Sequence, residues 1–146
     1  MTEAPAPLWA RNAPRVGQKA KRSRLVKPEY IRLFTEISGD SNPLHYDERA
    51  AGKSRFGEIV VQGGVTSSIL NAVVAEELPG PGTVFLQTDW RFEAPVRPGD
   101  TITGEVEVID VRQDKPITKL AAKVTRQDRV VVLSGSAVCY TMDIGL

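Results

Sequence analysis

Two kinds of apolar pattern divide the chain near residue 83. Before that point, apolar side chains recur three and four positions apart, which is the spacing of helices that bury one side. After it, the sequence consists of runs rich in Val, Thr, Ile and aromatic residues, which is typical of strands. The expected strands are residues 20–27, 83–92, 101–111, 117–126 and 129–142. The pattern therefore predicts a chain that combines a few helices with a sheet built mostly from its second half.

The first expected helix begins at Pro28, because proline is favoured in the first helical turn. Gly39 ends it, since glycine commonly follows the last helical residue. Its apolar side is expected to carry Tyr30, Ile31, Phe34 and Ile37. A short helical turn is expected at residues 47–51.

The longest expected helix spans residues 65–78 and follows the pair Gly63-Gly64. Apolar and small residues surround most of this helix as far as Ala75, and a helix of that kind is usually buried. The run of residues 79–82, Pro-Gly-Pro-Gly, ends it. The strands that follow are long, consecutive and joined by short turns, so an antiparallel sheet is expected. We therefore expect an α+β fold in which the antiparallel sheet wraps around a central buried helix.

Length and charge narrow the class of protein. A chain of 146 residues fits one domain, expected here at residues 16–146, preceded by a flexible Ala/Pro-rich arm at residues 1–15. Lys and Arg number 19 against 18 Asp and Glu, which argues against nucleic acid or a membrane surface as a partner. The single cysteine, Cys139, the lack of a visible signal peptide and the lack of a membrane-length apolar run indicate a cytoplasmic protein.

The loop of residues 39–45 holds the most specific candidate chemistry. It contains the only histidine, His45, five positions after Asp40, and the turn-forming pair Asn42-Pro43 lies between them. A carboxylate and an imidazole that converge on one water molecule can act as an acid/base pair. Taken singly, a lone histidine is more often structural, and an aspartate beside Asn-Pro is more often a turn former.

The surrounding residues resemble those of a known family, and this resemblance favours a catalytic role over a structural one for Asp40 and His45. Residues 34–47 read Phe-Thr-Glu-Ile-Ser-Gly-Asp-Ser-Asn-Pro-Leu-His-Tyr-Asp, and residues 92–100 read Phe-Glu-Ala-Pro-Val-Arg-Pro-Gly-Asp. Both segments resemble signatures of the MaoC-like, (R)-specific enoyl-CoA hydratase family, and the resemblance covers about residues 16–140. It implies the fold called hot-dog, a homodimer, and catalysis by Asp40 and His45, with Asn42 orienting the loop.

The start of the central helix indicates where a thioester carbonyl would be held. Gly63 starts the central helix, where free backbone N–H groups favour negative charge, so we expect Gly63, with Gly64, to polarise the carbonyl. Family members often have His-Gly-Met where this chain has Gln62-Gly63-Gly64. They often have a serine on the central helix where this chain has Asn71, which is either a substrate-binding residue or a buried amide bonded to a neighbour.

The expected function is reversible addition of water to a trans-2-enoyl-CoA, with the CoA thioester as substrate and no cofactor. No metal site is expected, because the histidine, the cysteine and the carboxylates show no recognised ligand spacing. The alternatives are a 3-hydroxyacyl-ACP dehydratase, a thioesterase of the same fold, and a non-catalytic acyl-CoA-binding protein. Arg91 and Arg97 are expected to be solvated, with contact to coenzyme phosphates as the alternative.

Overall fold

A computed structural model describes Trp9 and residues 13–145 of the chain. Five strands form one antiparallel sheet in the order β1-β3-β4-β5-β2. The strands are β1 (Lys19–Leu25), β2 (Thr83–Phe92), β3 (Thr101–Val111), β4 (Ile117–Arg126) and β5 (Val131–Thr141). The expected α+β class and antiparallel sheet are confirmed, and β2, β3 and β4 have the predicted bounds.

The helices are α1 (Glu29–Ser38), η1 (Pro43–His45), α2 (Glu48–Lys53) and α3 (Gly63–Glu76). Gly39 ends α1 in the left-handed conformation, at φ 77°, which glycine adopts without a steric penalty. Asp47 caps α2, because its carboxylate accepts hydrogen bonds from the backbone N–H groups of Arg49 and Ala50. The longest helix, α3, begins at Gly63, two residues before the predicted start.

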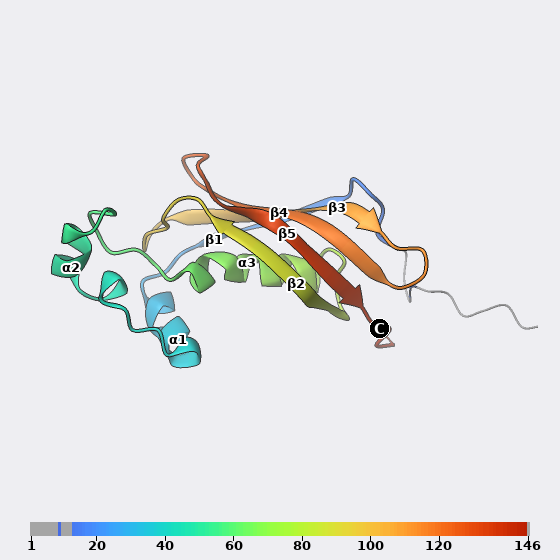
Figure 1. The fold of residues 1–146 in the computed structure, drawn as a ribbon, viewed down its shortest axis with the longest axis horizontal. Coiled ribbons are helices and arrows are strands. Elements are labelled where there is room, and N and C mark those ends of the chain that lie inside the picture. Colours follow the sequence, from blue (N-terminus) through green and yellow to red (C-terminus); the bar gives the residue numbers. More distant parts are fainter. Residues whose placement is uncertain (1–8, 10–12, 146) are drawn as a thin grey trace, which may run out of the picture.

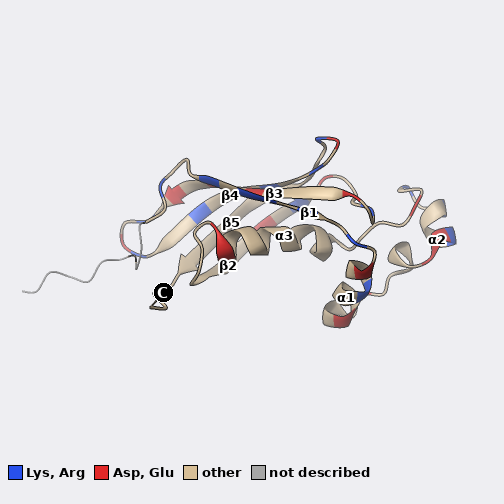
Figure 2. Cartoon of the chain, turned by 180° about the vertical axis from the view of Figure 1, so that it is seen from behind, with Lys and Arg blue, Asp and Glu red and all other residues tan. Residues whose placement is uncertain are grey.

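The core lies between α3 and one face of the sheet, and all five strands contact this helix (Figure 1). Figure 2 shows that α3 is free of charged residues over most of its length, whereas charges mark the strands and the outer helices. The buried residues of α3 are Val65, Thr66, Ile69, Leu70, Val73 and Val74. Burial of these side chains against alternate residues of the strands supplies the main hydrophobic stabilisation of the fold.

One side of α3 is not covered by the part of the chain that the structure describes, which corrects the expectation of burial on most sides. Gly63, Ser68, Asn71 and Ala75 are exposed along that side. The sequence did not show this difference because small residues are compatible with both buried and exposed positions. Asn71 is therefore not a buried amide in the single chain.

The segment from α1 to α2 projects beyond one end of the sheet (Figure 1). It buries little: only Ile31 in α1 and Ala51 in α2 are buried, and η1 has no buried residue. Ile37, expected on the apolar side of α1, is 82% exposed, so that expectation is wrong.

The predicted arm at residues 1–15 lies mostly outside the described residues, although Pro14 is buried. Among the described residues, no helix is long and apolar enough to span a membrane.

Candidate active site

The loop after α1 is shaped by short-range hydrogen bonds. The Asp40 N–H donates to Ser38 Oγ at 3.0 Å, and the Asn42 N–H donates to Asp40 Oδ1 at 3.1 Å. The Asn42 side chain accepts from the Leu44 N–H at 3.1 Å and so caps the short helix η1. These bonds turn the chain back within a few residues, which places His45 opposite Asp40.

Asp40 Oδ2 lies 3.8 Å from His45 Nε2. His45 Nδ1 lies 2.6 Å from the carbonyl oxygen of Val60, which can only accept a hydrogen bond, so Nδ1 carries the proton. Nε2 is then the nitrogen free to exchange a proton, and it faces the carboxylate. Both atoms can reach one water molecule. The His45 side chain is 10% exposed and that of Asp40 is 39% exposed, so solvent reaches the pair from the Asp40 side.

A pocket of about 570 Å³ adjoins His45. Gly63 and Thr66 of α3 form one wall, and residues 92–97, between β2 and β3, form another. The remaining lining residues are Leu44, Arg55, Phe56, Val60 and Val61. The walls are mostly apolar with a few polar groups, which suits a ligand that has a hydrocarbon part and one polar reacting group.

Gly63 lies at the N-terminus of α3 and lines the same pocket as His45. None of the described residues accepts a hydrogen bond from the Gly63 or Gly64 N–H, so both donors are free, as is usual in a first helical turn. A Cβ at position 63 would lie 2.9 Å from the Phe92 ring, so the ring packs directly against this glycine. The structure thus brings together three of the predicted groups: Asp40, His45 and the Gly63 amide.

Gly64 and Asn71 are placed differently. Gly64 lines a second, shallower pocket between α1 and α3, and a Cβ at this position would lie 2.0 Å from the Phe34 ring. Asn71 is exposed further along α3 and lines neither pocket. A contact between Asn71 and substrate stays a prediction.

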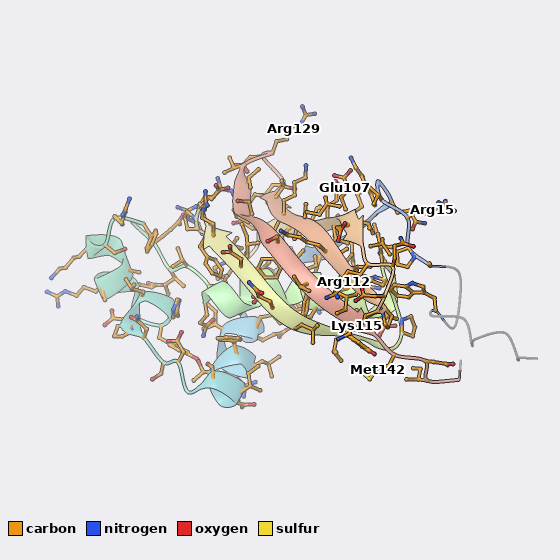
Figure 3. All side chains as sticks on the ribbon, turned by 45° about the vertical axis from the view of Figure 1, so that its right-hand side comes forward. Arg15, Glu107, Arg112, Lys115, Arg129 and Met142 are labelled. Carbon is orange, nitrogen blue, oxygen red and sulfur yellow. The ribbon has the colours of Figure 1, made fainter. Side chains whose placement is uncertain are left out.

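Shifted pKa values occur in the turns after β3 and β4 and within β5. In the turn after β3, hydrogen bonds from Arg112 hold the pKa of the Asp114 carboxyl below its usual value, and this turn is far from α1 and α2 (Figure 3). Arg126 lowers the pKa of Asp128 in the same way, and it also donates to the Pro95 carbonyl at 2.8 Å, which holds a wall of the first pocket. Burial raises the pKa of Cys139 to about 11.

The sequence did not reveal three features of the site. Val60 acts through its carbonyl oxygen, a group that every residue has, so no residue type signals it. Phe92, whose ring packs on Gly63, is the first residue of the second segment that resembles the family. The resemblance marked this position but did not indicate the contact with Gly63. Arg97, expected to be solvated, is only partly exposed; it lines the pocket and pairs with Glu58.

Comparison with known proteins identifies the family of the chain. The sequence model of the family described as "MaoC like domain" matches residues 11–130. The chain belongs to this family. As a MaoC-like protein, it is 36% identical over 123 residues to an (R)-specific enoyl-CoA hydratase of Aeromonas caviae, which covers 84% of this chain and 92% of the relative.

A second relative and a solved structure extend this result. A mitochondrial 3-hydroxyacyl-[acyl-carrier-protein] dehydratase of Arabidopsis thaliana is 32% identical over 126 residues, covering 84% of this chain and 75% of the relative. The structure of an (R)-hydratase from A. caviae superposes with a TM-score of 0.85 and 33% identity, covering 90% of this chain and all of the other. The five-stranded sheet with α3 against it therefore has the hot-dog fold of such hydratases.

Of the residues that the structure describes, no three His, Cys, Asp or Glu side chains are grouped as metal ligands.

Proposed function

We propose that this MaoC-like protein is an (R)-specific 2-enoyl-CoA hydratase, which in reverse is a 3-hydroxyacyl-CoA dehydratase. The observation that carries the proposal is the 3.8 Å approach of Asp40 Oδ2 to His45 Nε2 beside a pocket that Gly63 also lines. The reaction adds water across the C2=C3 bond of the acyl thioester, so that C3 gains the hydroxyl and C2 gains the other hydrogen. It needs no cofactor, since CoA is part of the substrate.

The geometry suits each requirement of hydration. One water molecule held between Asp40 and His45 loses a proton to the pair as its oxygen attacks the β-carbon, and a proton from the pair reaches the α-carbon. The thioester oxygen, which gains enolate charge, lies at the Gly63 N–H. The helix N-terminus stabilises that charge, and a donor of this kind contributes about 10²–10³ in turnover.

The second candidate function differs in the group that carries the acyl chain, which is an acyl carrier protein instead of CoA. The Arabidopsis relative named above is a dehydratase of acyl-carrier-protein substrates, and Asp40 and His45 can perform the same chemistry on either thioester. CoA is favoured because the A. caviae relative is matched over more of its own length.

One assay separates the candidates. Purified protein is incubated with crotonyl-CoA while the enoyl absorbance and the free thiol are followed together, and crotonyl-ACP is tested in parallel. Loss of enoyl absorbance without thiol release, faster with CoA than with ACP, is the expected result. Thiol release at constant absorbance indicates a thioesterase. Binding of crotonyl-CoA without any turnover indicates a non-catalytic acyl-CoA-binding protein.

We also propose a homodimer. β2 is an edge strand with an unpaired side, and its Val84, Leu86 and Phe92 are 45%, 56% and 55% exposed. Pairing with a second copy would continue the sheet and cover these residues. Light scattering should give twice the 15.9 kDa of one chain. A cytoplasmic location is proposed because Cys139 is a free thiol, as in reducing compartments.

A further inference from the structure

A cluster of hydrogen bonds around Thr35 joins the loop of residues 40–46, which contains Asp40 and His45, to the start of α3. Thr35 Oγ1 lies 2.7 Å from the Asp40 carbonyl oxygen and 2.5 Å from the Tyr46 hydroxyl. Gln62 Nε2 lies 3.3 Å from Thr35 Oγ1. Asp40 and Tyr46 are the two ends of the loop that contains the acid/base pair, and Gln62 is the residue that precedes α3.

The hydrogen-bonding capacity of a hydroxyl fixes the roles within this cluster. A hydroxyl has one hydrogen to donate and two lone pairs to accept. Two carbonyl oxygens near Thr35 Oγ1 can only accept, that of Asp40 at 2.7 Å and that of Ile31 at 3.1 Å, and its one hydrogen goes to the nearer, Asp40. Thr35 then accepts from the Tyr46 O–H and from Gln62 Nε2–H. The hydroxyl is thereby fully used, and removing it disconnects three segments at once.

Gln62 is built into the interior to make these bonds. It is 1% exposed, and its second N–H donates to the Ile31 carbonyl at 2.9 Å. Its Oε1 has no hydrogen-bond partner among the described residues. A buried acceptor without a partner is unfavourable, and an apolar side chain would avoid that cost. The amide therefore contributes through its two donated bonds, which hold α1 against the start of α3.

We propose that Thr35 is a positioning residue for the hydration reaction. Together with Gln62 and Tyr46, it sets the Asp40–His45 pair against the Gly63 amide. This inference rests on the proposed function for its kinetic consequence. None of these three side chains touches the reacting atoms, and their effect comes through the loop that they hold.

The kinetic test compares Thr35→Val, which keeps the shape and removes the hydroxyl, with Thr35→Ser, which keeps the hydroxyl. Thr35→Val should lower kcat for crotonyl-CoA by about 10- to 100-fold with little change in KM, because misplacement by about 1 Å has effects of this size. Thr35→Ser should restore most of kcat. Tyr46→Phe, at a 45% exposed side chain that should not affect folding, should lower kcat in the same direction.

Thr83→Val is the matched control. It breaks another hydroxyl–hydroxyl bond, 2.9 Å from Thr83 to Thr141, which lies outside the pocket, and it should leave kcat unchanged. Wild-type kcat in both Thr35→Val and Tyr46→Phe overturns the inference, as does a loss that Thr35→Ser fails to rescue.

A second readout does not depend on turnover. Because His45 is the only histidine, tag-free protein gives one set of imidazole NMR signals. Wild-type protein and Thr83→Val should show the tautomer with the proton on Nδ1, whereas Thr35→Val should populate both tautomers. Unchanged signals in Thr35→Val overturn the positioning role. An inactive wild-type protein with the expected NMR change rejects the proposed function and leaves the positioning role supported.

Discussion

The sheet with α3 and the segment from α1 to α2 are stabilised by different kinds of interaction. The sheet and α3 hold the large buried side chains, such as Ile69, Leu70, Leu120 and Leu133. The segment from α1 to α2 buries only Ile31 and Ala51, yet it contains Asp40 and His45. Its shape depends on polar contacts, including the Asn42 cap and the bond from His45 to the Val60 carbonyl. The hydrophobic core and the proposed acid/base pair therefore lie in different regions, although Gly63 at the start of α3 also lines the site. Substitutions at the pair should change turnover more than stability, and substitutions in the core should do the reverse.

The sharpest test of this separation is at the proposed acid/base pair. Asp40→Asn or His45→Ala should lower kcat for crotonyl-CoA by about 10²–10⁴-fold, because each removes one of the two groups that move protons. The melting temperature of Asp40→Asn should stay close to that of the wild type, since this side chain lies outside the core, whereas His45→Ala also loses the bond to the Val60 carbonyl. Wild-type turnover in either variant would remove the pair from the mechanism.

The reciprocal test is in the core. Ile69→Ala should lower the free energy of unfolding by about 2–5 kcal/mol, because Ile69 is fully buried and packs over Gly104. Turnover per folded molecule should change little. Ile109→Ala, at a 43% exposed position of β3, is the control and should cost much less stability in chemical denaturation. A core variant that loses turnover while remaining folded would show that the core also controls the chemistry.

The contact between the two regions can be tested at Gly64. A Cβ here would overlap the Phe34 ring, so Gly64→Ala should force the ring aside and destabilise the protein by about 1–3 kcal/mol. Gly52→Ala is a matched control in α2, where the nearest atom to a new Cβ is 4.0 Å away. There the helix propensity of alanine should leave stability unchanged or slightly raised. Equal effects of the two substitutions in thermal unfolding would contradict the packing of Phe34 on Gly64.

The smallest expected effect concerns the reactivity of Cys139, a buried residue of β5 in the core region. Burial raises the pKa of this thiol to about 11, so at pH 8 it stays protonated and inaccessible. The native protein should not react with a thiol-specific chromogenic disulfide, whereas protein unfolded in guanidinium chloride should release one equivalent. Rapid reaction of the native protein would show that the β4–β5–β2 part of the sheet opens readily.

The sequence predicted the core region better than the outer segment, for a physical reason. Strands β2, β3 and β4 have the predicted bounds, because alternating apolar residues and turn residues mark both ends of each strand. Ile37 was placed wrongly because helical spacing gives a periodicity without saying how much of α1 meets the rest of the protein. The exposed side of α3 was missed because its residues are small.

The candidate site was predicted only in part. Asp40, His45 and Gly63 were named because their residue types and the resembling segments marked them. The Val60 carbonyl and the bonds of Gln62 were not, because they depend on how residues distant in sequence meet after folding. The role of Asn71 stays a prediction, because its side chain is exposed and lines neither pocket.

The proposed reacting groups all lie in one uninterrupted stretch, residues 40–63, whereas the opposite pocket wall comes from residues 92–97. This separation has an evolutionary consequence. A recombination event that exchanges residues 35–63 between relatives moves the acid/base pair, the carbonyl-binding amide and their positioning residue Thr35 together. Divergence confined to the second stretch can alter which acyl chain fits while these groups are inherited unchanged.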